Sequence, residues 1–307
     1  MKHFTLPKEG GLVEKNIPSD ILHSYEKIRT EIYDQSTTAS EVIADEIIDS
    51  INACQGRTFK LGLSTGVTPV SLYKWLTRKY QEGKVSFSNV EVYSIDEYYP
   101  YGKGEPQSRN SILHNSLLNA VDIKEENIHI PDGSVPEDKI TAYCEEYDKM
   151  VRGLDMLVIG MGEMAQVGFN EAGTSPVSRT RTVLLSYQSR KRQGKNFNGD
   201  FKHTPSQAIT IGIDTMMSAK KIVLMAWGED KANAVKHVCE CNPDYEYPAS
   251  LFQGHQNICC YVDETAGSLL TRVVSPWLVG PCDWTRKFIR KAVVWLCQEV
   301  HKPILKL

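Results

Sequence analysis

The chain reads Phe59-Lys60-Leu61-Gly62-Leu63-Ser64-Thr65-Gly66-Val67-Thr68-Pro69 where a short apolar run passes through a glycine turn into a helix start. The run 59–63 is almost wholly apolar, as a strand buried on both faces of a parallel sheet must be. Gly66 permits a tight turn, and Thr68-Pro69 fits an N-cap followed by proline at the first helical position. This succession predicts the strand–turn–helix unit of an α/β protein.

Units of the same kind recur along the chain. Further strand-like runs lie at 90–95, 154–159, 208–211, 221–227 and 257–262, with helical periods between them. One helix is expected to start at a capping box of Thr38 and Glu41, and the last helix at Asp283. The alternation predicts a Rossmann-like, doubly wound α/β fold, in which a mainly parallel sheet is flanked by helices on both faces.

Composition excludes several classes of protein. The 307 residues are 41% hydrophobic, which is enough for a sizeable core and argues against a disordered chain. No apolar run reaches the roughly 18 residues that span a bilayer, so no membrane partner is expected. Because 35 basic and 38 acidic residues nearly balance, nucleic acid is not expected as a partner either.

The eight cysteines contain no C-x-x-C pair, and the start of the chain lacks the apolar stretch of a secretory signal. We interpret the cysteines as free thiols of a cytoplasmic protein, and we expect no metal site. Residues 1–270 are predicted to form one domain and 271–307 a helical extension packed on it. The apolar end, Ile304-Leu305-Lys306-Leu307, predicts either an edge strand or a junction to a further domain, and both interpretations stay open.

Ligands of open α/β sheets bind beyond the carboxyl ends of the strands, so residues that follow strands are the candidate site. The hydroxyls and amides of the 64–68 loop suit a phosphate, although an ordinary capped turn would look the same. Asp96 and Glu97 follow the 90–95 strand. A carboxylate in a crevice at this place can act as a general base, and the alternative is a pair of solvated loop acids.

Two more segments carry side chains suited to chemistry. The glycine-rich stretch 160–173 follows a strand and ends in Asn170-Glu171-Ala172-Gly173. Lys231 follows another strand, and Lys195 closes the basic run 189–195. Such a run is usually a solvated helix face, but a phosphate ester needs only one or two cations beside a helix start.

Taken in this order, the segments resemble the glucosamine-6-phosphate deaminase/isomerase family, whose relatives include the 6-phosphogluconolactonases. The resemblance covers most of residues 28–270 and rests on the segments 61–69, 96–98, 168–171, 178–181 and 210–212. Asp-Glu-Tyr at 96–98 and Ser-Arg-Thr-Arg at 178–181 favour the deaminase branch over the lactonases. The resemblance implies an enzyme that converts an amino-sugar 6-phosphate to fructose 6-phosphate and ammonia, with no metal, nucleotide or other cofactor.

The resemblance also implies roles for individual residues. The loop that holds the 6-phosphate corresponds to Ser64, Thr65, Gly66, Val67 and Thr68, and the phosphate-binding lysine to Lys231. Lys195 stands where the family usually has arginine, so it keeps the charge but loses the bidentate fork. Asp96 corresponds to the carboxylate that moves the C2 proton.

One departure from the family pattern affects catalysis. The family reads Gly-x-Gly-x-Asp-Gly-His-Ile-x-Phe-Asn-Glu, and this chain has Met164, Ala165 and Gln166 in place of Asp, Gly and His. The histidine is the ring-opening acid/base, and glutamine cannot exchange a proton near pH 7. Losing such a group typically lowers the rate about 10²- to 10⁴-fold. Glu171 is retained, without its usual partner.

Two hypotheses follow. The chain is an enzyme of this family, slow or acting on an already open sugar, or it is a non-catalytic sugar-phosphate-binding regulatory module. A lactonase is disfavoured because that chemistry also relies on the missing histidine position. Both hypotheses imply a hexosamine or hexose 6-phosphate as the small-molecule partner.

Regulation and assembly are further expectations from the resemblance. Hexameric members carry a Ser, Arg and Lys constellation for an activating sugar phosphate, and the matching positions here are Thr174, Arg181 and Val183. That site is therefore expected to be incomplete, while the chain is expected to be a homo-oligomer. The segments 276–279 and 294–298 resemble the end of the first module of two-module bacterial relatives, in which a deacetylase-like domain of the LmbE/PIG-L type follows.

Overall fold

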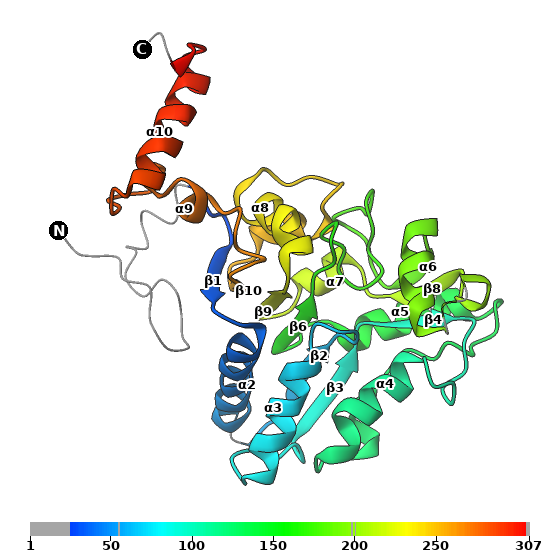
Figure 1. Ribbon diagram of the computed structural model, residues 1–307. Coiled ribbons are helices and arrows are strands. Elements are labelled where there is room, and N and C mark those ends of the chain that lie inside the picture. Colours follow the sequence, from blue (N-terminus) through cyan, green and yellow to red (C-terminus); the bar gives the residue numbers. More distant parts are fainter. Residues whose placement is uncertain (1–24, 55, 198, 200, 305–307) are drawn as a thin grey trace.

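A seven-stranded, wholly parallel sheet forms the centre of the computed structural model, which describes residues 25–54, 56–197, 199 and 201–304 (Figure 1). Its spatial order is β1-β10-β9-β6-β2-β3-β5. The strands are β1 (Arg29–Tyr33), β2 (Phe59–Leu63), β3 (Val90–Ser94), β5 (Ile128–His129), β6 (Met156–Gly160), β9 (Ile222–Ala226) and β10 (Ile258–Asp263).

Helices cover both faces of this sheet. Two separate hydrophobic clusters result, because successive strand residues point to opposite faces. In β9, for example, Val223 and Met225 belong to one cluster and Leu224 and Ala226 to the other. The face to which Val223 and Met225 point is covered by α2 (Ser36–Ala53), α3 (Val70–Gln81) and α4 (Arg109–Ser116). The opposite face is covered by α5 (Ile140–Val151), α7 (Ile213–Met217) and α8 (Ala232–Glu240). The predicted doubly wound α/β fold is confirmed.

A second, three-stranded antiparallel sheet lies beside the first, in the order β4-β8-β7. It consists of β4 (Asp96–Tyr99), β7 (Arg181–Leu184) and β8 (Gln207–Thr210), with α6 (Tyr187–Gln193) following β7. The strand expected at 208–211 therefore forms, but it pairs antiparallel outside the main sheet. Asp96 opens a strand of this sheet, so it is not a loop residue.

All three predicted helix starts are wrong, two of them at α2 and α3. The helix α2 begins at Ser36 with Gln35 as its N-cap, so Thr38 lies inside the first turn and cannot form the predicted capping box. The helix α3 begins at Val70 with Pro69 at the N-cap position, so Thr68 stands one residue before the cap. In both cases a neighbouring residue occupies the cap position that the local pattern assigned to a threonine.

The last helix, α10 (Arg286–Glu299), extends away from the sheet and is drawn in red in Figure 1. It follows α9 (Thr271–Val274). Its N-cap is Thr285, whose Oγ1 accepts from the backbone N–H of Phe288 at 3.2 Å, and not the predicted Asp283. Of the apolar end, Ile304 is exposed, and residues 305–307, on which the edge-strand prediction depends, lie outside the described residues.

The order of the strands fixes where a ligand can bind. After β2 the chain adds β3 and β5 on one side, and it then returns to add β6 and β9 on the other side of β2. The carboxyl ends of β2 and β6 therefore border the topological switch point, where open α/β sheets bind ligands. Within the described part of the chain, no helix is both long and apolar enough to cross a membrane.

Candidate active site

The predicted phosphate loop, residues 64–68, leaves the carboxyl end of β2 and is tied to β6. The Ser64 N–H donates to the Val158 carbonyl and its Oγ accepts from the Gly160 N–H, both at 3.1 Å. Gly66 has φ +113°, a conformation that strains any residue with a Cβ, and the space around it is open. The backbone amides of this turn are therefore free to approach a ligand.

Thr65 is the residue of this loop whose side chain is incompletely bonded. Its Oγ1 is buried and has no hydrogen-bond partner among the described residues. A buried hydroxyl left without a partner destabilises a protein, and such a group requires an explanation. An anionic ligand in the loop would supply the missing acceptor, whereas Val67 is a solvent-exposed residue, with a relative exposure of 90%.

The loop that follows β9 lies against the phosphate loop. The Trp227 indole Nε1–H donates to the Thr68 carbonyl at 2.9 Å. Lys231 ends the short 3-10 helix η5 (Glu229–Lys231) that follows, and its ammonium pairs with Asp230. The two segments predicted to hold the phosphate therefore meet at the same edge of the sheet.

Lys195, the other predicted cation, lies on η3 (Gly194–Asn196) after α6 and is exposed. One turn earlier, Arg192 pairs with Glu163 at 3.1 Å and so links α6 to the glycine-rich loop 160–171. This link brings the basic run to the neighbourhood of the site. The ion pair could not be predicted from the sequence, because neither residue belongs to a recognisable motif.

Asp96 is buried at the junction of the two sheets. Its residue exposure is 4%, and its Oδ1 lies 3.4 Å from the Nε of Arg109. Neither of these two atoms has a hydrogen-bond partner in the part of the chain that is described. Burial raises the pKa of the Asp96 carboxyl and the Arg109 guanidinium opposes that rise. A buried, incompletely bonded carboxylate is suited to accept a proton from a substrate.

Glu97 has a different role from its neighbour. Its carboxylate accepts from the backbone N–H groups of Tyr98, Arg109 and Asn110 at 2.8–2.9 Å. It therefore satisfies the amino-terminal N–H groups of α4, where a carboxylate is also favoured by the helix dipole. Neither Asp96 nor Glu97 is a solvated loop acid, and that alternative is excluded.

The glycine-rich loop that follows β6 passes directly beside Asp96. Gly168 has φ +57°, and a Cβ at this position would lie 2.9 Å from Thr210 Oγ1 and 3.4 Å from Asp96 Oδ2. The Phe169 N–H donates to Thr210 Oγ1 at 3.2 Å. The loop that carries the predicted residues 164–171 and the predicted base are thus in contact.

Gln166, at the position of the family histidine, is folded onto its own loop. Its Oε1 accepts from the Met164 N–H at 2.9 Å, and a Cβ on Gly162 would lie 2.2 Å from its Cδ. Ala165, which stands between Met164 and Gln166, has φ +55°, a left-handed conformation that favours glycine. The Gln166 carbonyl oxygen is therefore already engaged, and this side chain supplies no acid or base.

Glu171 lies toward the carboxyl-terminal end of the same glycine-rich loop. Its Oε2 accepts from the Ser186 N–H at 3.3 Å, and its buried Oε1 lacks a partner within the described ranges. The preceding Asn170 is fully buried and holds the loop in place: its Nδ2 donates to the Ile211 carbonyl at 2.8 Å, and its Oδ1 accepts from Arg181 at 3.1 Å.

The three positions that match the regulatory constellation lie together. Thr174, Arg181 and Val183 border one open hollow of about 520 Å³, with Glu171 on its wall. The apolar Val183 occupies the place of the expected cation. The hollow therefore holds the cationic side chain of Arg181, and the incomplete regulatory site stays a prediction.

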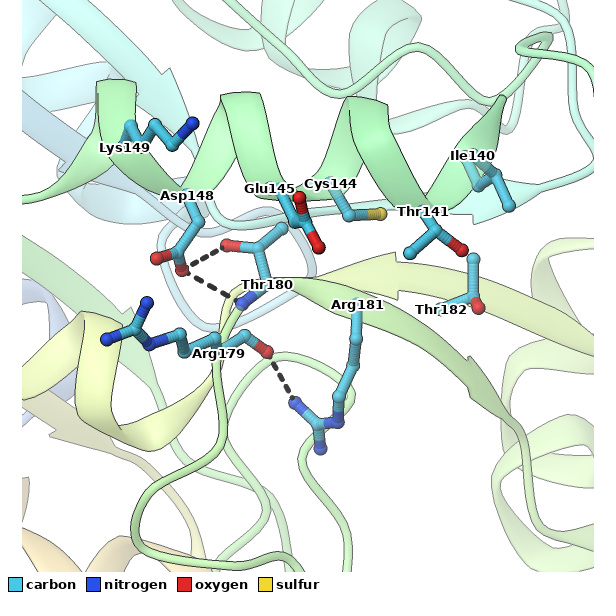
Figure 2. A pocket seen from close by; sticks show the side chains of 10 residues that line it. All are labelled: Ile140, Thr141, Cys144, Glu145, Asp148, Lys149, Arg179, Thr180, Arg181 and Thr182. Atoms are coloured by element: carbon cyan, nitrogen blue, oxygen red, sulfur yellow. Dashed lines mark hydrogen bonds between the residues drawn. The ribbon is translucent and has the colours of Figure 1, made fainter. Parts of the chain in front are cut away.

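A further hollow of about 380 Å³ lies between α5 and β7 (Figure 2). On its wall, Asp148 accepts from the backbone N–H and the Oγ1 of Thr180, each at 2.9 Å, and also from Thr215. Figure 2 shows that the Arg181 guanidinium points away from α5, toward the Arg179 carbonyl. The Asp148 carboxylate is thus bonded within the fold, and none of the predicted catalytic or substrate-binding residues lines this hollow, although Arg181 of the regulatory constellation does.

Arg109 is the main functional candidate that the sequence analysis missed. It stands in the first turn of α4, behind the N-cap Ser108, where nothing in the local sequence distinguishes it from an exposed helix residue. Its burial depends on Tyr98 and Phe169, which are remote from it in sequence. Only the tertiary structure brings these rings and Asp96 to it.

Comparisons with known proteins agree with this geometry. A sequence model described as "Glucosamine-6-phosphate isomerases/6-phosphogluconolactonase" matches residues 34–167. A glucosamine-6-phosphate deaminase-like protein of Bacteroides thetaiotaomicron is 40% identical over 299 residues, which are 96% of this chain and 45% of that protein. Glucosamine-6-phosphate deaminase 2 of Bacillus subtilis is 38% identical over 68% of this chain and 85% of its own length. The chain thus spans about half the length of the first relative and most of the second.

Among solved structures, one described as a monomeric glucosamine-6-phosphate deaminase superposes with a TM-score of 0.75. The two proteins are 31% identical, and the match covers 79% of this chain and 100% of the other. A 6-phosphogluconolactonase from Trypanosoma cruzi superposes with a TM-score of 0.64 at 16% identity, which shows a common fold.

Proposed function

This chain belongs to the glucosamine-6-phosphate deaminase/isomerase family, and on that premise we propose that it binds a hexosamine 6-phosphate and converts the open-chain sugar to fructose 6-phosphate and ammonia. The observation that carries the proposal is the buried Asp96 carboxylate, with one oxygen incompletely bonded, beside the loop that follows β6. A purely structural carboxylate would have satisfied its oxygens in the way that Glu97 does.

The proposed reaction divides among a few groups. The Thr65 hydroxyl, the amides around Gly66 and the Lys231 ammonium bind the 6-phosphate. Asp96 accepts the proton from C2 of the open-chain amino sugar and returns it to C1. Water then replaces the nitrogen, and ammonia leaves, so the overall conversion consumes one water and falls in the hydrolase class.

Ring opening is the step for which this chain lacks a dedicated group. Gln166 cannot relay a proton, and its carbonyl oxygen is engaged by the loop. We therefore propose that the chain uses the fraction of substrate that opens spontaneously. The rate should then fall short of a histidine-containing relative by about 10²- to 10⁴-fold.

A coupled assay for ammonia and fructose 6-phosphate tests this function, with Asp96→Asn as the control that removes the base. Turnover in the wild type that is lost in Asp96→Asn supports the proposal. The triple variant Met164→Asp, Ala165→Gly, Gln166→His should raise the rate, because it restores the acid/base on the same loop. Equal rates in wild type and Asp96→Asn would refute the enzymatic function.

A second candidate function is a non-catalytic sugar-phosphate-binding module. It is favoured by the Gln166 side chain, which is folded onto its own loop, and by the Arg109 guanidinium already paired with Asp96. This function predicts that glucosamine 6-phosphate raises the melting temperature while no ammonia is released. Thermal unfolding with and without the sugar, beside the coupled assay, separates the two functions.

Assembly and location extend the proposal. We propose a cytoplasmic protein that forms homo-oligomers, although the similar solved structure is described as monomeric. The exposed apolar side chains of α10, Ile289, Val293 and Leu296 among them, are proposed to pack on a following deacetylase-like domain of a longer protein. Light scattering of this chain measures the oligomeric state.

A further inference from the structure

We propose that Arg109 is a positioning residue for Asp96, which it holds as an oriented carboxylate from the first turn of α4. The proposal rests on the proposed role of Asp96 as the base and adds a residue to that site. Its basis is an ion pair between two side chains that are each 6% exposed, with 3.4 Å between Arg109 Nε and Asp96 Oδ1.

The guanidinium is fixed by aromatic rings. The Arg109 Cζ lies 4.7 Å from the centre of the Tyr98 ring and 5.1 Å from the centre of the Phe169 ring. Cation–π contacts of this kind strengthen when the cation is desolvated, as it is here. The two ring centres are themselves 5.5 Å apart, so the cation packs against an adjoining pair of rings that limits its freedom to turn away from Asp96.

The backbone of Arg109 is fixed as well. Its N–H donates to Glu97 Oε1 at 2.9 Å, and the Asn110 N–H donates to the other carboxylate oxygen. The N-cap Ser108 accepts from the Ser111 N–H at 3.0 Å. Glu97 is the neighbour of Asp96 in sequence, so it anchors the helix that places the guanidinium against Asp96.

The other titratable groups around Asp96 cannot replace this cation. They are Glu97 and Tyr98 on β4, Tyr73 on α3 and Tyr147 on α5, and each is neutral or negative. Burial favours the neutral carboxylic acid, which cannot accept a proton. The positive charge of the Arg109 guanidinium, on α4, opposes this effect.

The test follows the ionisation of Asp96 directly and needs no turnover. Protein labelled with ¹³C at the aspartate carboxyl is titrated by NMR, and Asp96→Asn assigns the signal. In Arg109→Gln the Asp96 pKa should rise by about one unit or more, because an opposite charge within 4–6 Å lowers a carboxyl pKa by one to three units. The matched control is Arg190→Gln. Arg190 lies on α6, and its guanidinium Cζ is 4.3 Å from the centre of the Phe201 ring, so its loss should leave the Asp96 pKa unchanged.

An unchanged Asp96 pKa in folded Arg109→Gln would overturn the proposal and leave Arg109 a purely structural residue. If that variant does not fold, Arg109→Met replaces it, because methionine packs against the two rings without a charge, and the same rise is expected. No rise in folded Arg109→Met would likewise overturn the proposal. If the Asp96 pKa rises in Arg109→Gln as expected but the wild type shows no turnover, the enzymatic function is refuted and the positioning role of Arg109 stands.

Discussion

The unpaired hydroxyl of Thr65 allows a test in which stability and binding change in opposite directions. Replacing Thr65 with valine keeps the shape and removes a buried hydroxyl without a partner among the described residues. Leaving such a group unsatisfied costs about 1–3 kcal/mol, so the ligand-free Thr65→Val protein should be more stable by about 1 kcal/mol or more. Urea unfolding measures this gain.

The same substitution should weaken ligand binding. A hydrogen bond to a charged group contributes about 1.5–3 kcal/mol, so the affinity for glucosamine 6-phosphate should fall roughly 10- to 150-fold. Calorimetric titration measures the affinity, and Thr65→Ser, which keeps the hydroxyl, is the control. A Thr65→Val protein with lower stability and unchanged affinity would refute the reasoning, because the hydroxyl would then serve the fold and not the ligand.

Three further predictions concern the buried groups near the site. Gly168→Ala should lower the free energy of unfolding by about 1–3 kcal/mol, because the new Cβ would lie 2.9 Å from Thr210 Oγ1 in a left-handed backbone. The control Gly83→Ala is also left-handed but lies in open space, so it should cost only about 1 kcal/mol, and equal losses in urea unfolding would contradict this prediction. Ala165→Gly should change the free energy of unfolding by less than about 1 kcal/mol. It relieves about 1–2 kcal/mol of backbone strain, and this gain offsets the loss of a buried methyl group and the greater freedom of the unfolded chain. A loss of stability well above about 1 kcal/mol would show that Ala165 is unstrained. Burial raises the pKa of Glu97 to about 7 from an ordinary value of 4.5, so its contribution to stability is complete below pH 4.5 and is lost as the pH rises from 4.5 through 7, by at most about 3 kcal/mol. Urea midpoints between about pH 4.5 and 7.5 should therefore fall for wild type and fall less for Glu97→Gln, and identical slopes would contradict the assignment.

The inner strands of the main sheet could be predicted because they are buried on both faces and so consist of nearly continuous apolar runs, as in β6 and β9, whereas the two-residue edge strand β5 was missed. The strand β1 could not, because it mixes Arg29 and Glu31 with apolar residues at the edge of the sheet. The antiparallel sheet was missed because β4 and β7 are four residues long and carry polar side chains. The starts of α2 and α3 were misplaced because their N-caps, Gln35 and Pro69, make no side-chain cap bond, so a search for a capping hydroxyl selects a nearby threonine instead.

In the candidate site, the residues that follow strands were predictable, and the contacts between them were not. The positions of Thr65 and Asp96 follow from where β2 and β3 end, since parallel strands bring their carboxyl ends to one edge. The bond from Trp227 to Thr68 and the ion pair of Asp96 with Arg109 join segments far apart in sequence. Periodicity in a single sequence carries no information about such pairs.

The left-handed backbone at Ala165 bears on how this chain diverged. Ala165 carries a Cβ and yet adopts a backbone conformation that glycine takes more readily, so the course of this loop does not require glycine at 165. Evolution could silence or revive the proton relay by exchanging three side chains, without rebuilding the scaffold that presents them.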